Sequence, residues 1–175
     1  MKKTALFLLI VLLLTVTCSQ DNDQLQKSVR SYNALLAEGY SEMNMNHLMS
    51  VATPEQATRV YHHMAVLGQG QVKMDPLLQS IRFSKVSQLS PEKAEVVTTE
   101  AWNYRYINLQ TGKAGKDLSI NYTVRYKLIK ESGKWLIADV TILASDRKDD
   151  SEELPFFKRP ADVAPGSAPP AEQRP

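Results

Sequence analysis

The sequence predicts an α+β domain in which N-terminal helices pack on a four-stranded antiparallel sheet. Between residues 25 and 70, apolar side chains recur at steps of three and four, which is the spacing of one helix face. After Pro76 the spacing changes to two, and turn signals divide the chain into four strand-like runs. Helices that precede an antiparallel meander are typical of the α+β class, so the order of the two patterns predicts the architecture.

Three helical segments are expected in the first half of the chain. Residues 25–39 should form an amphipathic helix, and residues 43–49 should add one or two turns. Thr53 is a typical N-cap and Pro54 a typical first residue of the next helix, which should end near Gly68. The buried faces of the two longer helices are predicted to be Leu25, Val29, Tyr32, Leu36 and Tyr40 in the first, and Ala57, Val60, Tyr61, Met64 and Leu67 in the second.

The four predicted strands are residues 80–89, 94–109, 118–130 and 135–143. In the third run, apolar or aromatic residues alternate strictly with polar ones, so one face of the sheet should be buried and the other wet. The alternation also predicts the register, and we expect Tyr104 to lie opposite Tyr122. That pairing gives the second strand an apolar face made of Val96, Thr98, Glu100, Trp102, Tyr104 and Tyr106.

The N-terminus is predicted to be a targeting signal. Two lysines precede an apolar run from Ala5 to Val16, which is the pattern of a secretory signal peptide over residues 1–17. As a helix, this run would span about 18 Å at 1.5 Å per residue, against about 30 Å for the hydrocarbon core of a bilayer. A stable transmembrane anchor is therefore disfavoured.

Cys18 is the single cysteine of the chain and stands where signal cleavage is expected. The segment resembles a bacterial lipoprotein signal, in which such a cysteine is diacylated and becomes the mature N-terminus. Thr15 and Thr17 depart from that pattern, so plain cleavage that yields a soluble periplasmic protein remains an alternative. The resemblance implies attachment to a membrane through the lipid, and Ser19, in place of Asp, implies the periplasmic side of the outer membrane.

The mature chain is predicted to have three parts. Residues 18–24 should form a short linker, residues 25–145 the domain, and residues 146–175 a tail without a core of its own. The tail begins with a charged run and contains six of the nine prolines, a composition typical of disordered or polyproline-like segments.

Composition excludes several function classes. The 21 Lys and Arg nearly balance the 19 Asp and Glu, so a nucleic-acid-binding surface is not expected. One cysteine cannot form an intramolecular disulfide, and the cysteine and the three histidines lack the spacing of a zinc site. His62 and His63 are adjacent on a predicted helix, so their side chains diverge by about 100° and cannot share one metal ion. No metal or cofactor is expected.

Three segments resemble the NTF2-like superfamily, also described as the cystatin-like α+β cone. They are TEAWNYRY at 99–106, YTVRYKL at 122–128 and GKWLIADV at 133–140. Such strands are similar to those of accessory NTF2-like domains, including the IMS-type domains of plastid-division proteins. The resemblance covers about residues 25–145 and implies a curved sheet that encloses an apolar cavity, but it assigns no catalytic residue.

The cavity implied by this resemblance has six candidate residues: Glu100, Trp102, Tyr104, Tyr122, Tyr126 and Asp139. The first functional interpretation is an exported, lipid-anchored, non-enzymatic module that binds an envelope protein or component. The alternative is a periplasmic binder of a small apolar ligand, or an acid/base enzyme that uses Glu100 or Asp139, because an apolar site raises the pKa of a carboxyl group. The polar face with Arg105, Arg125 and Lys127 is expected to support a weak homodimer at most.

Overall fold

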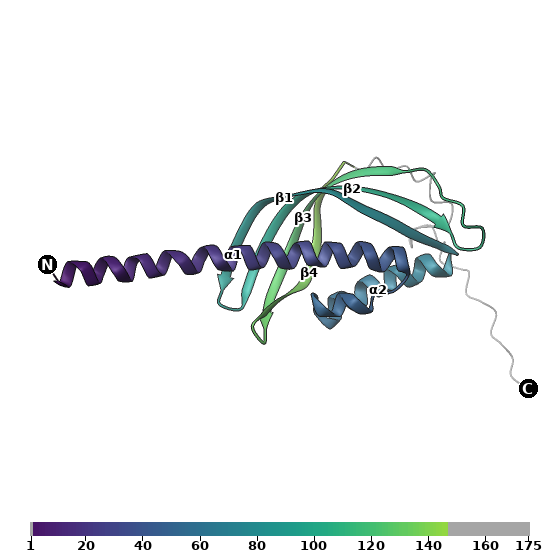
Figure 1. The fold of residues 1–175 in the computed structure, drawn as a ribbon. Helices are drawn as coiled ribbons and strands as arrows, with labels where there is room; N and C mark the ends of the chain where they lie inside the picture. The colour runs from purple at the N-terminus through teal and green to yellow at the C-terminus, as the bar shows by residue number, and fades with distance from the viewer. Residues whose placement is uncertain (1, 147–175) are drawn as a thin grey trace, which may run out of the picture.

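The computed structural model describes residues 2–146, with residues 2–20 described by their backbone alone. Its elements are α1 (Lys2–Glu42), the 3₁₀ helix η1 (Asn46–Ser50), α2 (Pro54–Gln69), β1 (Val72–Ser90), β2 (Lys93–Asn108), β3 (Leu118–Glu131) and β4 (Lys134–Ser145). The strands form one antiparallel sheet in the order β1-β2-β3-β4 (Figure 1). The predicted α+β fold, with helices packed on a four-stranded antiparallel sheet, is confirmed.

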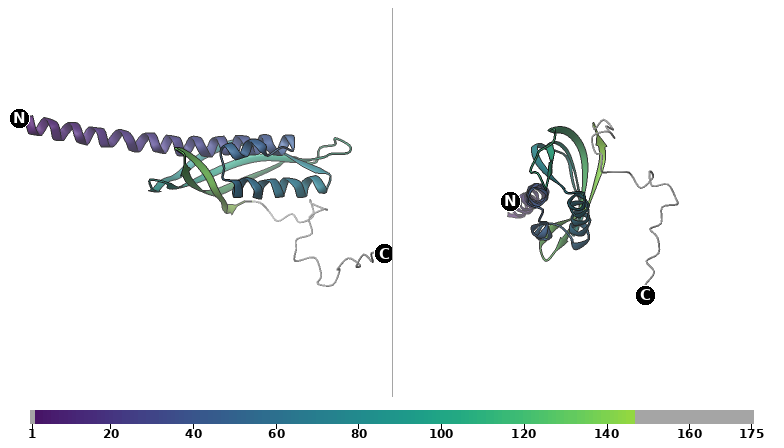
Figure 2. Two further views of the ribbon diagram at one scale, coloured as in Figure 1. Left: turned by 90° about the horizontal axis from the view of Figure 1, so that it is seen from below. Right: turned by 90° about the vertical axis from the view of Figure 1, so that its right-hand side faces the viewer.

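Helix α1 is longer than predicted. It begins at Lys2 instead of Leu25, so residues 18–24, which were expected to form a linker, are helical. The chain has no Gly or Pro between residues 2 and 38, and nothing in this stretch breaks a helix. The N-terminal part of α1 projects beyond the sheet (Figure 2), and packing begins at Leu25, which is fully buried.

The end of α1 and the start of α2 follow local chemistry. Gly39 does not end the helix but allows a close approach, because a Cβ there would lie 2.5 Å from Met45 Sδ. The helix ends instead at Glu42, and the next residue, Met43, has a positive φ of 57°. Thr53 caps α2 as predicted, since its hydroxyl accepts a hydrogen bond from the Gln56 N–H at 3.3 Å.

The prediction of the buried face of α2 is wrong for one residue. Tyr61 is 52% exposed, whereas the other four residues of that face are buried. It directly follows Val60, and one step along a helix turns the side chain by about 100°, which carries it out of the core.

Strand β1 starts earlier than the predicted run and contains Pro76. A proline has no N–H to donate to a ladder, so it is tolerated in an edge strand, which β1 is. Register shifts at three places, the first between Leu78 and Ser80, interrupt its pairing with β2. All three shifts lie after Pro76, and such β-bulges bend a strand and interrupt its two-residue period.

The predicted register between β2 and β3 is wrong by four residues. Tyr104 lies opposite Leu118, and Tyr122 lies opposite Glu100. After Asn108 the chain turns back on itself: the Asn108 side chain accepts hydrogen bonds from the backbone of Gln110 and Thr111, which takes the following residues out of the ladder. Because the register error is an even number of residues, the side chains predicted to lie on the inner face of β2 still lie there.

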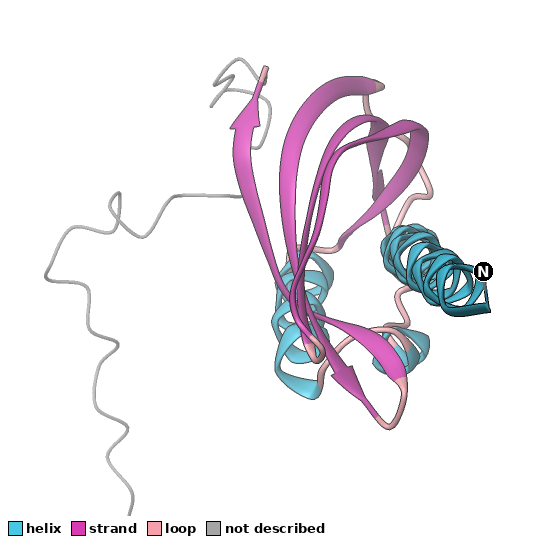
Figure 3. Ribbon diagram, turned by 90° about the vertical axis from the view of Figure 1, so that its left-hand side faces the viewer, coloured by secondary structure: helices cyan, strands magenta, loops and turns pink. Residues whose placement is uncertain are grey.

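Both long helices pack on the concave face of the curved sheet, and the core lies between them (Figure 3). Among the residues described with their side chains, no helix has the length and apolar character needed to cross a membrane. The predicted tail lies outside the described residues from 147 onward, while Asp146 is held to β3 by two hydrogen bonds from Asn121, which lower the pKa of the Asp146 carboxyl.

Candidate functional site

A cavity of about 410 Å³ lies between the C-terminal half of α1, helix α2 and the inner face of the sheet. Its walls contain six of the seven tyrosines of the chain, together with one tryptophan and one histidine. The lining residues are Tyr32, Asn33, Leu36, Tyr40, Gln56, Val60, His63, Met74, Pro76, Glu100, Trp102, Tyr104, Tyr106, Tyr122, Val124, Tyr126, Val140 and Ile142. Its size and its aromatic walls are those of a small-molecule site.

Glu100 is the charged group of this cavity and is 2% exposed. Four donors converge on its carboxylate. Oε1 accepts hydrogen bonds from Asn33 Nδ2 at 3.1 Å, Thr98 Oγ1 at 2.7 Å and the Tyr126 hydroxyl at 2.7 Å. Oε2 accepts one from Trp102 Nε1 at 2.8 Å. The donors come from α1, β2 and β3, so the carboxylate joins the helix to the centre of the sheet.

The donors suit an ionised carboxylate, which accepts hydrogen bonds and donates none. Burial of such a charge is costly unless hydrogen bonds compensate it. The Tyr126 hydroxyl also lies 3.0 Å from Asn33 Oδ1, but its single proton can serve only one acceptor at a time. Burial, followed by the charge of Glu100 and the hydrogen bond to it, raises the pKa of Tyr126 well above its ordinary value. Tyr126 therefore keeps its proton and remains a donor.

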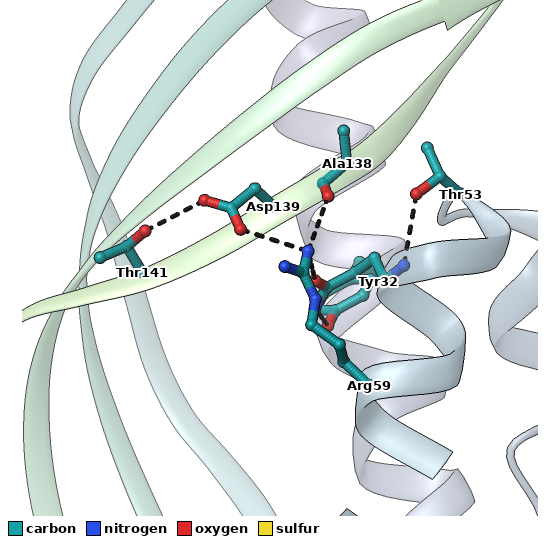
Figure 4. A network of polar contacts seen from close by, with 7 residues as sticks. Tyr32, Thr53, Arg59, Ala138, Asp139 and Thr141 are labelled. Atoms are coloured by element: carbon teal, nitrogen blue, oxygen red, sulfur yellow. Dashed lines mark hydrogen bonds and ion pairs between the residues drawn. The ribbon is translucent and has the colours of Figure 1, made fainter. Parts of the chain in front are cut away.

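The structure brings five of the six predicted site residues together. Glu100, Trp102, Tyr104, Tyr122 and Tyr126 all line the cavity. The sixth, Asp139, forms an ion pair with Arg59 at 3.2 Å and accepts a hydrogen bond from Thr141 at 3.1 Å (Figure 4). Its side chain is 33% exposed, and it is not one of the residues that line the cavity.

A β-bulge explains the position of Asp139. Trp135 and Ile137 are buried, and strict alternation would bring Asp139 to the same face. Lys127 pairs with Asp139 while Leu128 pairs with Ile137, so Ala138 is an extra residue in β4. The extra residue reverses the alternation, and Val140 and Ile142 line the cavity instead.

The polar network of Figure 4 holds the cavity wall in place. Arg59 on α2 donates hydrogen bonds to the Ala138 carbonyl at 3.0 Å and to Gln56 Oε1 at 2.7 Å. Gln56 Nε2 in turn donates to the Tyr32 hydroxyl at 2.8 Å. The network thus links β4 to α2 and α2 to α1. Burial outweighs the hydrogen bond from Gln56 and raises the pKa of Tyr32 to about 12.

Polar residues of the cavity that were not among the six candidates include Asn33, Tyr40, Gln56 and His63. The Tyr40 hydroxyl lies 2.6 Å from His63 Nδ1, and the two rings meet edge to face. Partial burial lowers the pKa of His63, so its imidazole is neutral at pH 7, while burial raises the pKa of Tyr40. A signal for His63 was present, because it follows Val60 by three residues and so shares its face of the helix.

Among the described residues, no group of three or more His, Cys, Asp or Glu side chains is arranged to hold a metal ion. The polar groups of the cavity are instead distributed around its wall as single hydrogen-bonding positions. Such an arrangement can bind and orient an organic molecule.

No family model and no curated protein sequence matches this chain. Among solved structures, it is similar to the intermembrane space region of the chloroplast protein ARC6, with 16% identity and a TM-score of 0.63 over 70% of this chain and 96% of that one. At this identity the similarity shows a shared fold, which is the fold implied by the resemblance to IMS-type domains. A ketosteroid isomerase-like protein from Erwinia carotovora atroseptica matches at 14% identity over 71% of this chain and 97% of its own, with a TM-score of 0.46.

Proposed function

We propose that this protein is an exported, non-enzymatic binding module that is held on the periplasmic side of the outer membrane by a lipid on Cys18 and binds an envelope component in its cavity. The observation that carries the proposal is the hydrogen bonding of the Glu100 carboxylate. The four hydrogen bonds that it accepts from described residues stabilise the carboxylate in its ionised form and hold it in one orientation. The cavity is therefore better suited to holding a ligand than to acid/base chemistry.

The geometry of α1 supports the membrane attachment. Leu25, the first fully buried residue among those described with their side chains, follows Cys18 by seven residues, or about 10 Å along a helix. A chain that starts at Cys18 would also have Asp21 and Asp23 near the new helix N-terminus, where negative charge stabilises a helix. Asp21 lies 3.9 Å from Lys130 at the end of β3. The lipid would thus hold the domain close to the membrane without a long linker.

Native mass spectrometry tests both the lipid anchor and the binding of a ligand. The protein is expressed with its own signal and extracted from Gram-negative membranes. The expected species begins at Cys18 and carries the added mass of a diacylglyceryl group. It also retains a small bound molecule, here called the companion, that is lost on denaturation. A Cys18→Ser variant should lose the increment and leave the washed membrane fraction. Unchanged membrane retention of this variant would contradict the anchor.

A pair of variants tests whether the companion is bound in the cavity. Val140→Trp adds bulk inside the cavity and should abolish retention of the companion. Leu77→Trp makes a comparable change at a side chain that is 61% exposed, and it should leave retention unchanged. Equal retention by the two variants would show that the companion is bound elsewhere and would refute the assignment of the cavity.

A further inference from the structure

We propose that the ligand of the cavity is a small free organic amine in its cationic form, bound between the carboxylate of Glu100 and the aromatic wall. This inference rests on the proposed function, because it names the chemical class of the molecule that the cavity binds. Three features of the described residues carry it: the charge balance around Glu100, the distribution of its hydrogen bonds, and the rings that surround it.

Among the described residues, no cationic side chain forms an ion pair with Glu100. The ion pairs between described residues engage other carboxylates, namely Asp139, Glu95, Asp75 and Asp21. Arg59, which lies on the neighbouring helix α2, directs its guanidinium to Asp139 and to the Ala138 carbonyl. Buried charges in proteins are usually paired with an opposite charge, so the interior of this cavity is electrostatically suited to a cation.

The hydrogen bonds of Glu100 are unevenly divided between its two oxygens. From described residues, Oε1 accepts three hydrogen bonds and Oε2 accepts one, from Trp102. Each oxygen of a carboxylate has two lone pairs: the three donors to Oε1 share its two, whereas one lone pair of Oε2 is left for a further donor. An N–H of an ammonium group would form a charge-assisted hydrogen bond there, which is stronger than a bond between neutral groups.

The walls of the cavity add to the same preference. The rings of Tyr32, Trp102, Tyr104, Tyr106, Tyr122 and Tyr126 line it, and the faces of such rings attract cations. Tyr104 and Tyr106 meet edge to face at 5.7 Å, which fixes the orientation of both rings. The one titratable cationic group of the lining, His63, is neutral at pH 7 because partial burial lowers its pKa. It therefore does not repel a bound cation.

The position of the cavity favours a free molecule over a lipid headgroup. The α1 residues that line it begin at Tyr32, fourteen residues beyond Cys18 and so about 21 Å along the helix from the proposed lipid. A headgroup of the membrane that holds the lipid would have to leave the bilayer surface to reach this site. A small soluble amine has no such restriction.

Isothermal titration of the lipidated full chain in non-ionic detergent at pH 7 tests the inference with three probes of one shape class. Benzylammonium carries a charge and N–H donors, benzyltrimethylammonium carries the charge alone, and benzyl alcohol is neutral. Both cations should bind at least tenfold more tightly than the alcohol, and benzylammonium should bind more tightly than its trimethylated analogue. Excess phosphatidylethanolamine, added as mixed micelles with the same detergent, should not displace benzylammonium, and displacement would overturn the assignment to a free amine.

Two variants and a matched control locate the effect. Glu100→Gln should reduce the tenfold preference to nearly one, whereas Asp139→Asn, which neutralises a carboxylate outside the cavity, should leave it unchanged. If Glu100→Gln does not fold, Tyr104→Leu should reduce the preference several-fold while retaining affinity for the alcohol. Equal affinity of the wild-type protein for all three probes would overturn the amine and leave the cavity as a neutral binding site. Failure of all three to bind would contradict the proposed function itself.

Discussion

The Tyr126 hydroxyl offers a sharp test of the buried carboxylate site, through the variant Tyr126→Phe. The residue is 2% exposed, and its hydroxyl donates to Glu100 Oε1 at 2.7 Å. Phenylalanine keeps the ring and its edge-to-face contact with Tyr32, whose centroid lies 6.1 Å away. The variant loses one buried hydrogen bond to a charged group, which is worth about 1.5 to 3 kcal/mol. We therefore expect the free energy of unfolding to fall by about 2 kcal/mol at pH 7.

The same substitution should cost less at alkaline pH. In the unfolded chain a tyrosine ionises near pH 10, whereas burial and Glu100 hold the pKa of Tyr126 well above that value in the folded protein. Above pH 10 the unfolded state binds fewer protons than the folded state, so the contribution of Tyr126 to stability falls as the pH rises. At pH 11 this loss amounts to about 1.4 kcal/mol in the wild type and is absent from the variant. The difference between the two proteins should therefore shrink to below about 1 kcal/mol.

Urea unfolding followed by far-ultraviolet circular dichroism at pH 7 and pH 11 measures both values. Tyr32 and Tyr40, whose pKa values are also raised, are present in both proteins, so their own alkaline losses cancel in the difference. Tyr61→Phe is the matched control, because Tyr61 is 52% exposed and its loss should change stability at pH 7 by less than about 0.5 kcal/mol. A cost of Tyr126→Phe that is the same at both pH values would refute the proposed hydrogen bond to an ionised Glu100.

Three further predictions concern other parts of the structure. Trp102→Phe removes the donor to Glu100 Oε2 and should lower the free energy of unfolding by about 1.5 to 3 kcal/mol in the same urea assay, and an unchanged midpoint would argue against this bond. Arg59→Ala removes the partly exposed ion pair with Asp139, for which the cost should be about 1 kcal/mol or less, so a loss above about 3 kcal/mol would contradict the view that solvent screens this pair. The protein should be monomeric or weakly dimeric, because Arg105 on the polar face already pairs with Asp75, and light scattering that shows a tight dimer at nanomolar concentration would contradict this.

The inner wall of the cavity was predictable because it depends on a local period. Alternation along β2 is sufficient to place Glu100, Trp102 and Tyr104 on one face, and the burial pattern of the strand follows it without interruption. The same reasoning fails on β4, where the extra residue Ala138 turns Asp139 outward. A bulge of this kind depends on pairing with the neighbouring strand, and the sequence of β4 alone contains no sign of it.

The extent of α1 was mispredicted for a different reason. The apolar run and the charged residues around it resemble a targeting signal, and this led to a linker over residues 18–24. The structure contains the chain with that segment attached, and its residues have good helix propensity with no break before Gly39. The signal-peptide prediction concerns processing of the chain, so the helix and a cleavage at Cys18 are compatible: a cut there would shorten α1 without removing Leu25 or any residue of the cavity.

The polar partners of Glu100 required knowledge of tertiary structure, although part of the information was present in the sequence. Asn33 follows Val29 by four residues and therefore lies on the buried face of α1, where an amide is costly unless it is hydrogen-bonded. Glu100 is likewise a polar residue on a predicted apolar face, and the two are separated by 67 positions in the chain. Asn33 needs a partner that its own helix does not supply, which is an argument for pairing it with a buried acceptor of the sheet such as Glu100. Tyr126, the third residue of this cluster, lies opposite Val96, four residues along β2 from Glu100. Its hydroxyl reaches the carboxylate because side chains converge on the concave face of a curved sheet. A period of two identifies the face of Tyr126, but only the bending of the sheet brings its hydroxyl to Glu100.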